Sequence, residues 1–156
     1  MKTETLFQPI QQQLNPYVTA WQTPEPNRFD AMLSAGELLN AMNVLYNNRQ
    51  IYLIAITGID NGVEANTFEL LYHFAMGSIV LTLRVTINRT RSTIPSICSI
   101  YPYASPFERE TSEMFGITFL ESPDISRLFL PDDWTDGIYP LRKDAQLEGD
   151  KDDQNK

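Results

Sequence analysis

The feature that most constrains the fold is a pair of strand-like segments, residues 67–76 and 78–88, separated by Gly77. In the second segment apolar and polar residues alternate, and only Val80 interrupts the pattern. Successive side chains of a strand point to opposite faces of a sheet, so this period of two predicts a strand with one buried and one solvated face. A glycine between two such segments predicts a β-hairpin.

Further strands are predicted on both sides of the hairpin. Residues 28–33 favour a short strand, and the continuously apolar residues 51–57 favour a central one. Residues 94–101 form another apolar run, but Pro95 interrupts it and indicates an edge position. Because no crossover helix fits between residues 66 and 88, the sheet should be mostly antiparallel.

Two helices are predicted in the N-terminal third. Residues 3–15 and residues 35–48 each carry apolar side chains at helical spacing. Ser34 is a favourable N-cap and Glu37 follows three residues later, so the second helix should begin with a capping box. We expect this helix to cover one face of the sheet.

A third helix is predicted over residues 106–115. Ser105 and Glu108 form a second capping box at its start, and Gly116 is a typical stop signal at its end. The same start signal recurs in residues 122–124, which predict another short helical turn.

The chain becomes irregular after residue 130, where prolines and a glycine replace any periodic pattern. Residues 145–156 are polar, charged and free of aromatics, and we expect them to form a disordered acidic tail. The sequence therefore predicts a single domain over residues 1–144. Its fold class is α+β, with a mostly antiparallel sheet, helices on one face and an irregular C-terminal tail. We expect this tail to pack poorly on its own domain or to lean on a neighbouring copy of the chain.

Composition excludes several classes of function. The net charge of −8 argues against binding to nucleic acid or to anionic lipid. The single cysteine, Cys98, excludes an internal disulfide, a four-cysteine iron–sulfur site and a structural zinc site within this chain. No apolar run approaches the roughly 20 residues of a membrane helix, and the N-terminus does not resemble a secretory signal. We expect a cytoplasmic protein.

Candidate catalytic residues are few. His73 is the only histidine and has no second metal ligand near it, so it is best interpreted as a strand residue. Cys98 lies in an apolar run, and a nucleophilic role would require a base such as His73 within reach. Arg109 and Glu113 are four residues apart and can pair on a helix surface.

Two alternatives to a partner-binding role stay open on the residues alone. One is a free-standing enzyme that uses Glu110, Glu113 and His73, although no nucleophile accompanies these carboxylates. The other is a module that binds a small ligand in an apolar cavity under the sheet. Arginine and aromatic residues are enriched in protein interfaces, and both occur in the irregular tail, which favours partner binding.

Several motifs in this chain resemble those of a known family. They are Glu108-Arg109-Glu110, Glu113-Met114-Phe115-Gly116-Ile117, Pro123-Asp124, Arg127-Leu128 and Pro140-Leu141-Arg142-Lys143-Asp144, with Tyr72-His73-Phe74 and Pro95-Ser96-Ile97 upstream. In this order they resemble the signature of the C-type, thirty-kilodalton subunit of the proton-pumping NADH:quinone oxidoreductase of respiratory complex I. The resemblance covers about residues 28–144.

The resemblance implies a non-catalytic subunit in the peripheral arm of an ion-translocating complex, without an iron–sulfur cluster, flavin or metal of its own. The implied partners are the hydrogenase-like large subunit of the D type and an iron–sulfur subunit of the B type, with iron–sulfur clusters held by other subunits. The complex would attach the chain to the inner face of the cell membrane. In isolation, the chain could form a homo-oligomer through the surface meant for its partner.

The chain departs from the respiratory pattern at two places. Glu121-Ser122 precedes Pro-Asp, and Gly137-Ile138-Tyr139 precedes Pro-Leu-Arg-Lys-Asp, where respiratory members usually have Gly-His. The segments 130–134 and 137–140 more closely resemble the equivalent accessory subunit of energy-converting [NiFe] hydrogenases. The electron donor and acceptor of the complex therefore stay open.

The predicted partner interface is drawn from the motifs and the tail. Its residues are Glu108, Arg109, Glu110, Glu113, Phe115, Gly116, Asp124, Arg127, Trp134, Tyr139, Leu141, Arg142, Lys143 and Asp144. We predict no catalytic, cofactor-binding or metal-binding residue.

Overall fold

The computed structural model describes the backbone of residues 2–147 and the side chains of residues 7–147. Most of the segment predicted to be disordered, residues 145–156, lies outside the described residues. The elements follow one another as α1 (Lys2–Leu14), β1 (Ala20–Glu25), β2 (Arg28–Leu33), the 3-10 turn η1 (Ala35–Glu37), α2 (Leu38–Tyr46), β3 (Tyr52–Asp60), β4 (Thr67–Met76), β5 (Ile79–Asn88), β6 (Thr93–Pro95), the 3-10 turn η2 (Pro102–Ala104), α3 (Ser105–Phe115) and β7 (Thr118–Leu120).

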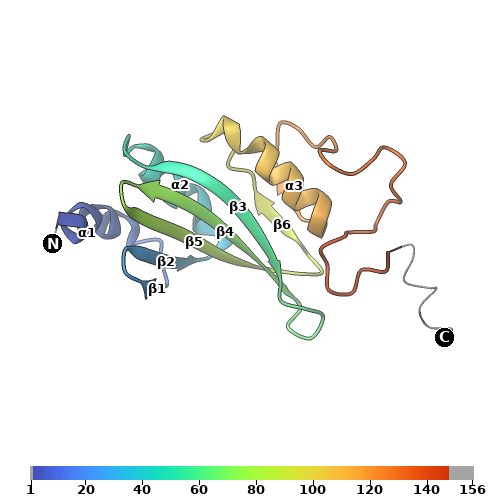
Figure 1. Cartoon of the computed structure of the whole chain (residues 1–156), viewed down its shortest axis with the longest axis horizontal. Coiled ribbons are helices and arrows are strands. Elements are labelled where there is room, and N and C mark those ends of the chain that lie inside the picture. The colour runs from blue at the N-terminus through green and yellow to red at the C-terminus, as the bar shows by residue number, and fades with distance from the viewer. Residues whose placement is uncertain (1, 148–156) are drawn as a thin grey trace.

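Five strands form the main sheet in the order β1-β2-β5-β4-β3 (Figure 1). The pairs β1–β2, β3–β4 and β4–β5 are antiparallel, and β2–β5 is parallel. The prediction of a mostly antiparallel sheet is confirmed. The predicted hairpin is also confirmed: β4 and β5 pair in unbroken register from Thr67↔Asn88 to Met76↔Ile79, and Gly77 turns between them with φ +59°.

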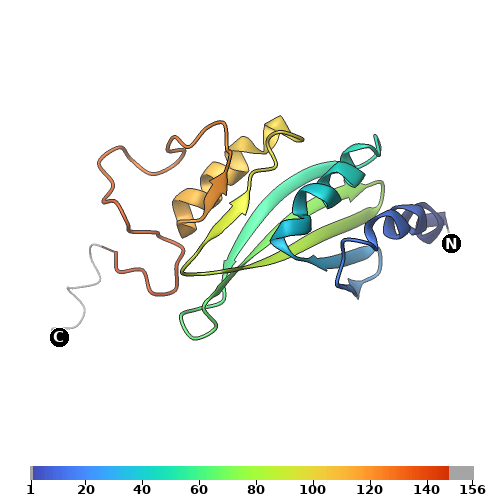
Figure 2. The same cartoon turned by 180° about the vertical axis from the view of Figure 1, so that it is seen from behind.

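The hydrophobic core lies on one face of this sheet. Every second side chain of β4 and β5 is buried there, as the alternating sequence predicted: Phe68, Leu70, Tyr72, Phe74 and Met76, and Ile79, Leu81, Leu83, Val85 and Ile87. Helix α2 covers this face in Figure 2, and its Leu38, Ala41, Met42 and Leu45 are buried. The prediction of an α+β fold with helices on one face is confirmed.

The opposite face of the sheet is polar. Arg84 of β5 donates to Glu69 of β4 at 2.6 Å and to Asp30 of β2 at 3.0 Å. All three side chains are partly buried, and their ion pairs connect three strands on the face that the helices of residues 2–147 leave uncovered.

Two strand predictions are wrong in position. Residues 51–57 do not form a central strand, because β3 is the last strand of the sheet and exposes Tyr52 and Ile54. A continuous apolar run cannot distinguish burial on both faces from an edge strand with exposed apolar side chains. Of the predicted run 94–101, only β6 is a strand, and it pairs in parallel with β7 in a separate two-stranded sheet.

Both predicted capping boxes are absent. Ser34 makes no capping hydrogen bond, and the 3-10 turn η1 stands between it and α2. Ser105 is the first residue of α3, directly after η2, so the turn η2 leads into the helix without a side-chain cap. Residues 122–124 do not form the predicted helical turn; the Asp124 carboxylate accepts the N–H of Ser126 at 2.8 Å instead.

Helix α3 ends as predicted, at Gly116, which adopts the left-handed conformation. Its last residue, Phe115, is buried and packs against Phe68 of β4 with ring centroids 6.0 Å apart. The helix also approaches β3 closely at Gly58, where an added Cβ would lie 2.6 Å from Phe115 Cε2. A side chain larger than hydrogen therefore does not fit at this position.

We predict that Gly58→Ala destabilises the chain by about 1–3 kcal/mol, because the new methyl group overpacks the contact between β3 and α3. Gly36→Ala is the matched control, since its nearest neighbour would lie at 3.8 Å. Urea unfolding of both variants measures the effect. Equal stability of the two variants would show that α3 can move away from β3 at little cost.

Candidate partner interface

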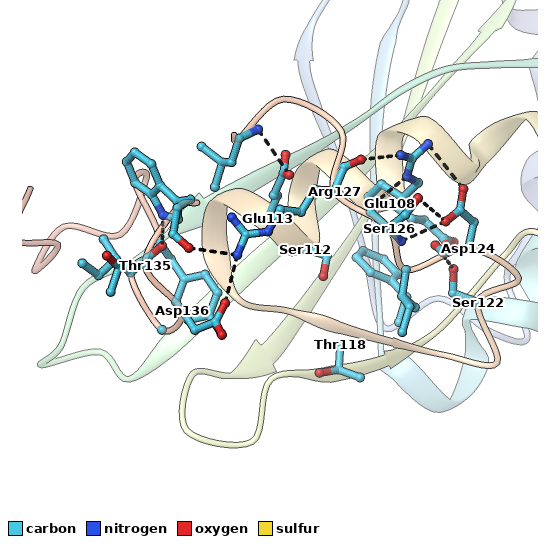
Figure 3. Close-up of a pocket in the computed structure, with 18 residues that line it drawn as sticks. Glu108, Ser112, Glu113, Thr118, Ser122, Asp124, Ser126, Arg127, Thr135 and Asp136 are labelled. Carbon is cyan, nitrogen blue, oxygen red and sulfur yellow. Dashed lines mark hydrogen bonds and ion pairs between the residues drawn. The ribbon is translucent and has the colours of Figure 1, made fainter. Parts of the chain in front are cut away.

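The C-terminal tail, residues 121–147, contains no helix or strand and folds back over α3. Glu113 of α3 is the first side chain of the folded domain that anchors the backbone of the tail (Figure 3). The Glu113 carboxylate accepts the N–H groups of Leu128 and Phe129 at 2.9 Å and that of Leu130 at 3.3 Å. One carboxylate thus satisfies three consecutive N–H groups that no strand pairs.

Arg109, one helical turn before Glu113, holds the same part of the tail by its carbonyl groups. Its guanidinium donates to the carbonyl oxygens of Ser126 at 2.9 Å and Arg127 at 2.6 Å, and it lies 3.4 Å from Asp124. The Ser126 side chain and backbone N–H lower the pKa of Asp124. The predicted Arg109–Glu113 pair is therefore not formed; both side chains bind the tail.

Arg127 forms hydrogen bonds with later residues of the same tail. It donates to the carbonyl oxygens of Pro131 at 2.7 Å and Trp134 at 3.0 Å, and it pairs with Asp136 at 2.9 Å. The indole N–H of Trp134 donates to the carbonyl of Ile138 at 2.9 Å. The Trp134 side chain is half-buried.

Arg142 fastens the tail to the end of α3. Its Nε donates to the carbonyl of Phe115 at 2.6 Å, and its guanidinium lies over the rings of Phe68 at 5.2 Å and Tyr139 at 4.5 Å. Gly116 permits this arrangement, since its φ is +71° and an added Cβ would lie 2.5 Å from the Tyr139 ring. Glycine is required here for two independent reasons.

Asp60, at the end of β3, binds the last described part of the tail. It accepts from Arg89 Nε at 3.0 Å and from the N–H of Lys143 at 2.9 Å. Arg89 also pairs with Asp144. Burial raises the pKa of Asp60, but the hydrogen bonds from Arg89, Lys143 and Gly62 outweigh it and lower the pKa to about 2.

Glu108 is buried and binds β6 and the turn that follows it rather than the backbone of the tail. Its carboxylate accepts from Ser96 Oγ and Ile97 N–H at 2.7 Å and from the Cys98 thiol at 3.3 Å. Burial raises the pKa of Glu108, and these hydrogen bonds partly offset that effect. Burial also raises the pKa of Cys98 to about 11, so the thiol is not poised as a nucleophile.

The residues of the enzyme alternative are not brought together. His73 projects from the polar face of the sheet, and its ring nitrogens lie 3.1 Å from Thr57 Oγ1 and 3.1 Å from Thr82 Oγ1. Glu113 belongs to the tail contact at the other face, and Glu110 is exposed. Desolvation lowers the pKa of His73. No arrangement for acid–base catalysis results from these three residues.

Most of the predicted interface residues hold the tail rather than project from it. Leu141 is 55% exposed and Glu110 is exposed, whereas Phe115 is buried and Tyr139 is half-buried. The expectation of a poorly packed tail is wrong in one respect, because hydrogen bonds and ion pairs anchor it along its length. Yet no side chain in residues 121–147 is buried. The tail also exposes Ile125 (90%) and Phe129 (63%).

Sequence reasoning missed Asp60 and Arg89, which bind the tail. Asp60 lies in a Gly-Ile-Asp-Asn-Gly stretch typical of a turn, and Arg89 follows a strand, so nothing local indicates a partner 83 residues away. Within residues 7–147 the structure places no three His, Cys, Asp or Glu side chains where they could hold a metal ion. Among the helices of residues 2–147, none is long and apolar enough to cross a membrane.

The family model for the respiratory-chain NADH dehydrogenase 30 kDa subunit matches residues 31–151. The chain belongs to this family. Among curated relatives, the NADH-quinone oxidoreductase C subunit of Parvibaculum lavamentivorans is 38% identical over 98 residues, 62% of this chain and 48% of the relative. The chain thus spans about half the length of the first curated relatives it matches.

A different kind of relative is formate hydrogenlyase subunit 5 of Escherichia coli. It is 31% identical over 129 residues, which are 81% of this chain but only 22% of that protein. The region similar to this chain is therefore a minor part of a much longer polypeptide in that relative.

Two solved structures share the fold. A chain of the archaeal membrane-bound sulfane sulfur reductase matches with a TM-score of 0.82 at 21% identity, over 99% of this chain and 92% of that one. A trypsin-resistant fragment (1–134) of Nqo5 matches with a TM-score of 0.58 at 17% identity, over 80% and 99%. At these identities the likeness concerns the fold alone.

We predict that Arg142→Ala destabilises the isolated chain by about 2 kcal/mol, because it removes a charge-assisted hydrogen bond and two cation–π contacts. Arg49→Ala is the control, since Arg49 is exposed. Thermal and urea unfolding measure the difference. Equal stability of the two variants would mean that Arg142 does not hold the tail on the domain.

Asp60 predicts a specific pH dependence. Its folded pKa, about 2, lies below the ordinary value of 3.8, so its contribution is present above pH 3.8 and is lost as the pH falls toward 2. We expect Asp60→Asn to be less stable than the parent chain at pH 7 by about 2 kcal/mol. The difference should shrink between about pH 4 and pH 2. Asp132→Asn, at an exposed site, should show neither effect; a difference for Asp60→Asn that is constant with pH would contradict this account.

Proposed function

We propose that this chain is a non-catalytic subunit of a membrane-associated, ion-translocating oxidoreductase complex of the NADH:quinone oxidoreductase type. It docks on the hydrogenase-like large subunit through α3 and the tail. The observation that carries this proposal is the tail itself, which is anchored by charged side chains although none of its own side chains in residues 121–147 is buried. Ordering such a segment adds little to the stability of a lone domain, because it buries no side chains. An ordered segment does, however, offer a partner a preformed binding surface.

The comparisons support the same role. Family membership and the relatives named as C subunits of NADH-quinone oxidoreductase favour a place in a respiratory complex. In formate hydrogenlyase subunit 5 the similar region is joined to a far longer polypeptide. We infer that, for this chain, a separate large subunit of the D type takes the place of the rest of that polypeptide. An iron–sulfur subunit of the B type lies beside it.

The remaining features of the proposal follow from this assembly. Redox chemistry takes place on iron–sulfur clusters in other subunits, and this chain contributes no cofactor. The chain lies on the cytoplasmic side and is attached to the inner face of the cell membrane through the complex. Its acidic charge disfavours direct binding to anionic lipid.

A second candidate is the equivalent accessory subunit of an energy-converting [NiFe] hydrogenase. It is favoured by the similarity to formate hydrogenlyase subunit 5 over 81% of this chain. Analysis of the isolated complex distinguishes the two candidates. Co-purification of an NADH-binding flavoprotein supports the first, and detection of nickel in the large subunit supports the second.

The test is purification of the tagged chain from detergent-solubilised membranes of its source organism, followed by mass spectrometry of the bound subunits. We expect the large subunit and the iron–sulfur subunit to be recovered. Phe129→Asp should reduce their recovery at least about tenfold, as expected for a central apolar interface residue. Tyr52→Asp is the matched control, because both side chains are 63% exposed and Tyr52 lies on β3, away from the tail.

Three results would contradict the proposal. Recovery of the chain alone would show that it does not belong to such a complex. Equal loss of partners from both variants, or loss from Tyr52→Asp only, would place the docking surface elsewhere. The unfolding temperature of each variant shows whether the substitution changed the fold rather than the interface.

A further inference from the structure

A pocket of about 440 Å³ lies between α3 and the tail (Figure 3). Arg109, Ser112 and Glu113 form the helical wall, and Phe119 of β7 lies beside them. Ile125 and residues 134–139 form the opposite wall. The pocket is therefore lined by apolar and charged side chains together, and the tail residues around it are not buried.

The charged side chains that line this pocket are acidic in sum, because Glu108, Glu113, Asp124 and Asp136 outnumber Arg109 and Arg127. Arg109 and Arg127 are engaged by carbonyl groups of the tail, and Glu113 is engaged by three N–H groups. The carboxylates of Asp124 and Asp136, in contrast, are 44% and 100% exposed. Each has one arginine partner, but much of its surface faces solvent.

We propose that this pocket receives an arginine or lysine side chain from the large partner subunit, an inference that rests on the proposed function. The cationic end of that side chain lies between Asp124 and Asp136, where its charge complements the exposed carboxylates. Its aliphatic stem packs along Ile125 and the tail wall, in the manner of long basic side chains on apolar surfaces. The pocket thus selects the partner by charge and fixes its register on α3.

A second copy of this chain is a poorer occupant. Its net charge of −8 opposes approach to an acidic pocket. The arginines of its tail, Arg127 and Arg142, are already bonded to their own chain. A separate subunit with a basic contact surface fits the acidic pocket better than a second copy of this acidic chain.

The experiment uses the complex purified from membranes. First, p-benzoylphenylalanine replaces Ile125, which lines the pocket and is 90% exposed, and photo-cross-linking identifies the partner residues in contact. We expect a segment of the large subunit that carries an arginine or lysine at the cross-linked position or next to it. This arm identifies the occupant without altering any charge of the pocket.

Second, charge reversal tests the contact. Asp136→Lys should weaken retention of the chain in the complex about tenfold, because a repulsive pair replaces an attractive one. Asp132→Lys is the matched control, an exposed carboxylate of the same tail that does not line the pocket. Replacing the cross-linked basic residue of the partner by glutamate should restore retention of Asp136→Lys.

The outcomes separate the two proposals. Failure to recover any larger subunit overturns the proposed function and this inference with it. Recovery of the large subunit, with a cross-link to a segment without a basic residue or to a second copy of this chain, overturns only the inference. Two further results overturn only the inference. One is equal retention of the Asp136→Lys and Asp132→Lys variants, and the other is failure of the glutamate substitution in the partner to restore retention of Asp136→Lys.

Discussion

The backbone of the tail needs hydrogen-bond partners that no helix or sheet provides, and charged side chains of the folded domain provide them. Glu113 accepts from three N–H groups, Arg109 donates to two carbonyls, and Asp60 accepts the N–H of Lys143. Hydrogen bonds to ionised groups are stronger than neutral ones, so a few side chains suffice to fix a long irregular segment. The shape of the tail depends on these contacts more than on burial.

This way of ordering the chain leaves the tail's apolar side chains on the outside. Ile125, Phe129 and Leu141 are all more than half exposed. Because the backbone beneath these side chains is already anchored, the tail loses little further conformational entropy when a partner binds. The same contacts thus account both for the stability of the tail and for its suitability as a docking surface.

The elements that local sequence determines were predictable. The β4–β5 hairpin follows from alternation around Gly77, and the end of α3 follows from Gly116. The irregular course of the tail was predictable from its lack of periodicity. In each case the deciding interactions lie within a few residues along the chain.

The wrong predictions concern interactions between distant residues. Local rules assign Glu108 to a capping box, but Ser96, Ile97 and Cys98 offer it three donors in the core. The tail was expected to pack poorly because its sequence has no periodic apolar pattern. Asp60, which accepts the N–H of Lys143, is 83 residues away, and no local spacing connects the two.

The central claim, that the tail is the docking surface, is tested most directly by hydroxyl-radical footprinting of the chain alone and within its complex. The account predicts that oxidation of Phe129 and Leu141 falls strongly on assembly. Oxidation of Tyr52 and Val63, which are 63% and 60% exposed but lie on β3 and in the β3–β4 loop, should not change. Protection of Tyr52 and Val63 with unchanged oxidation of the tail would contradict it.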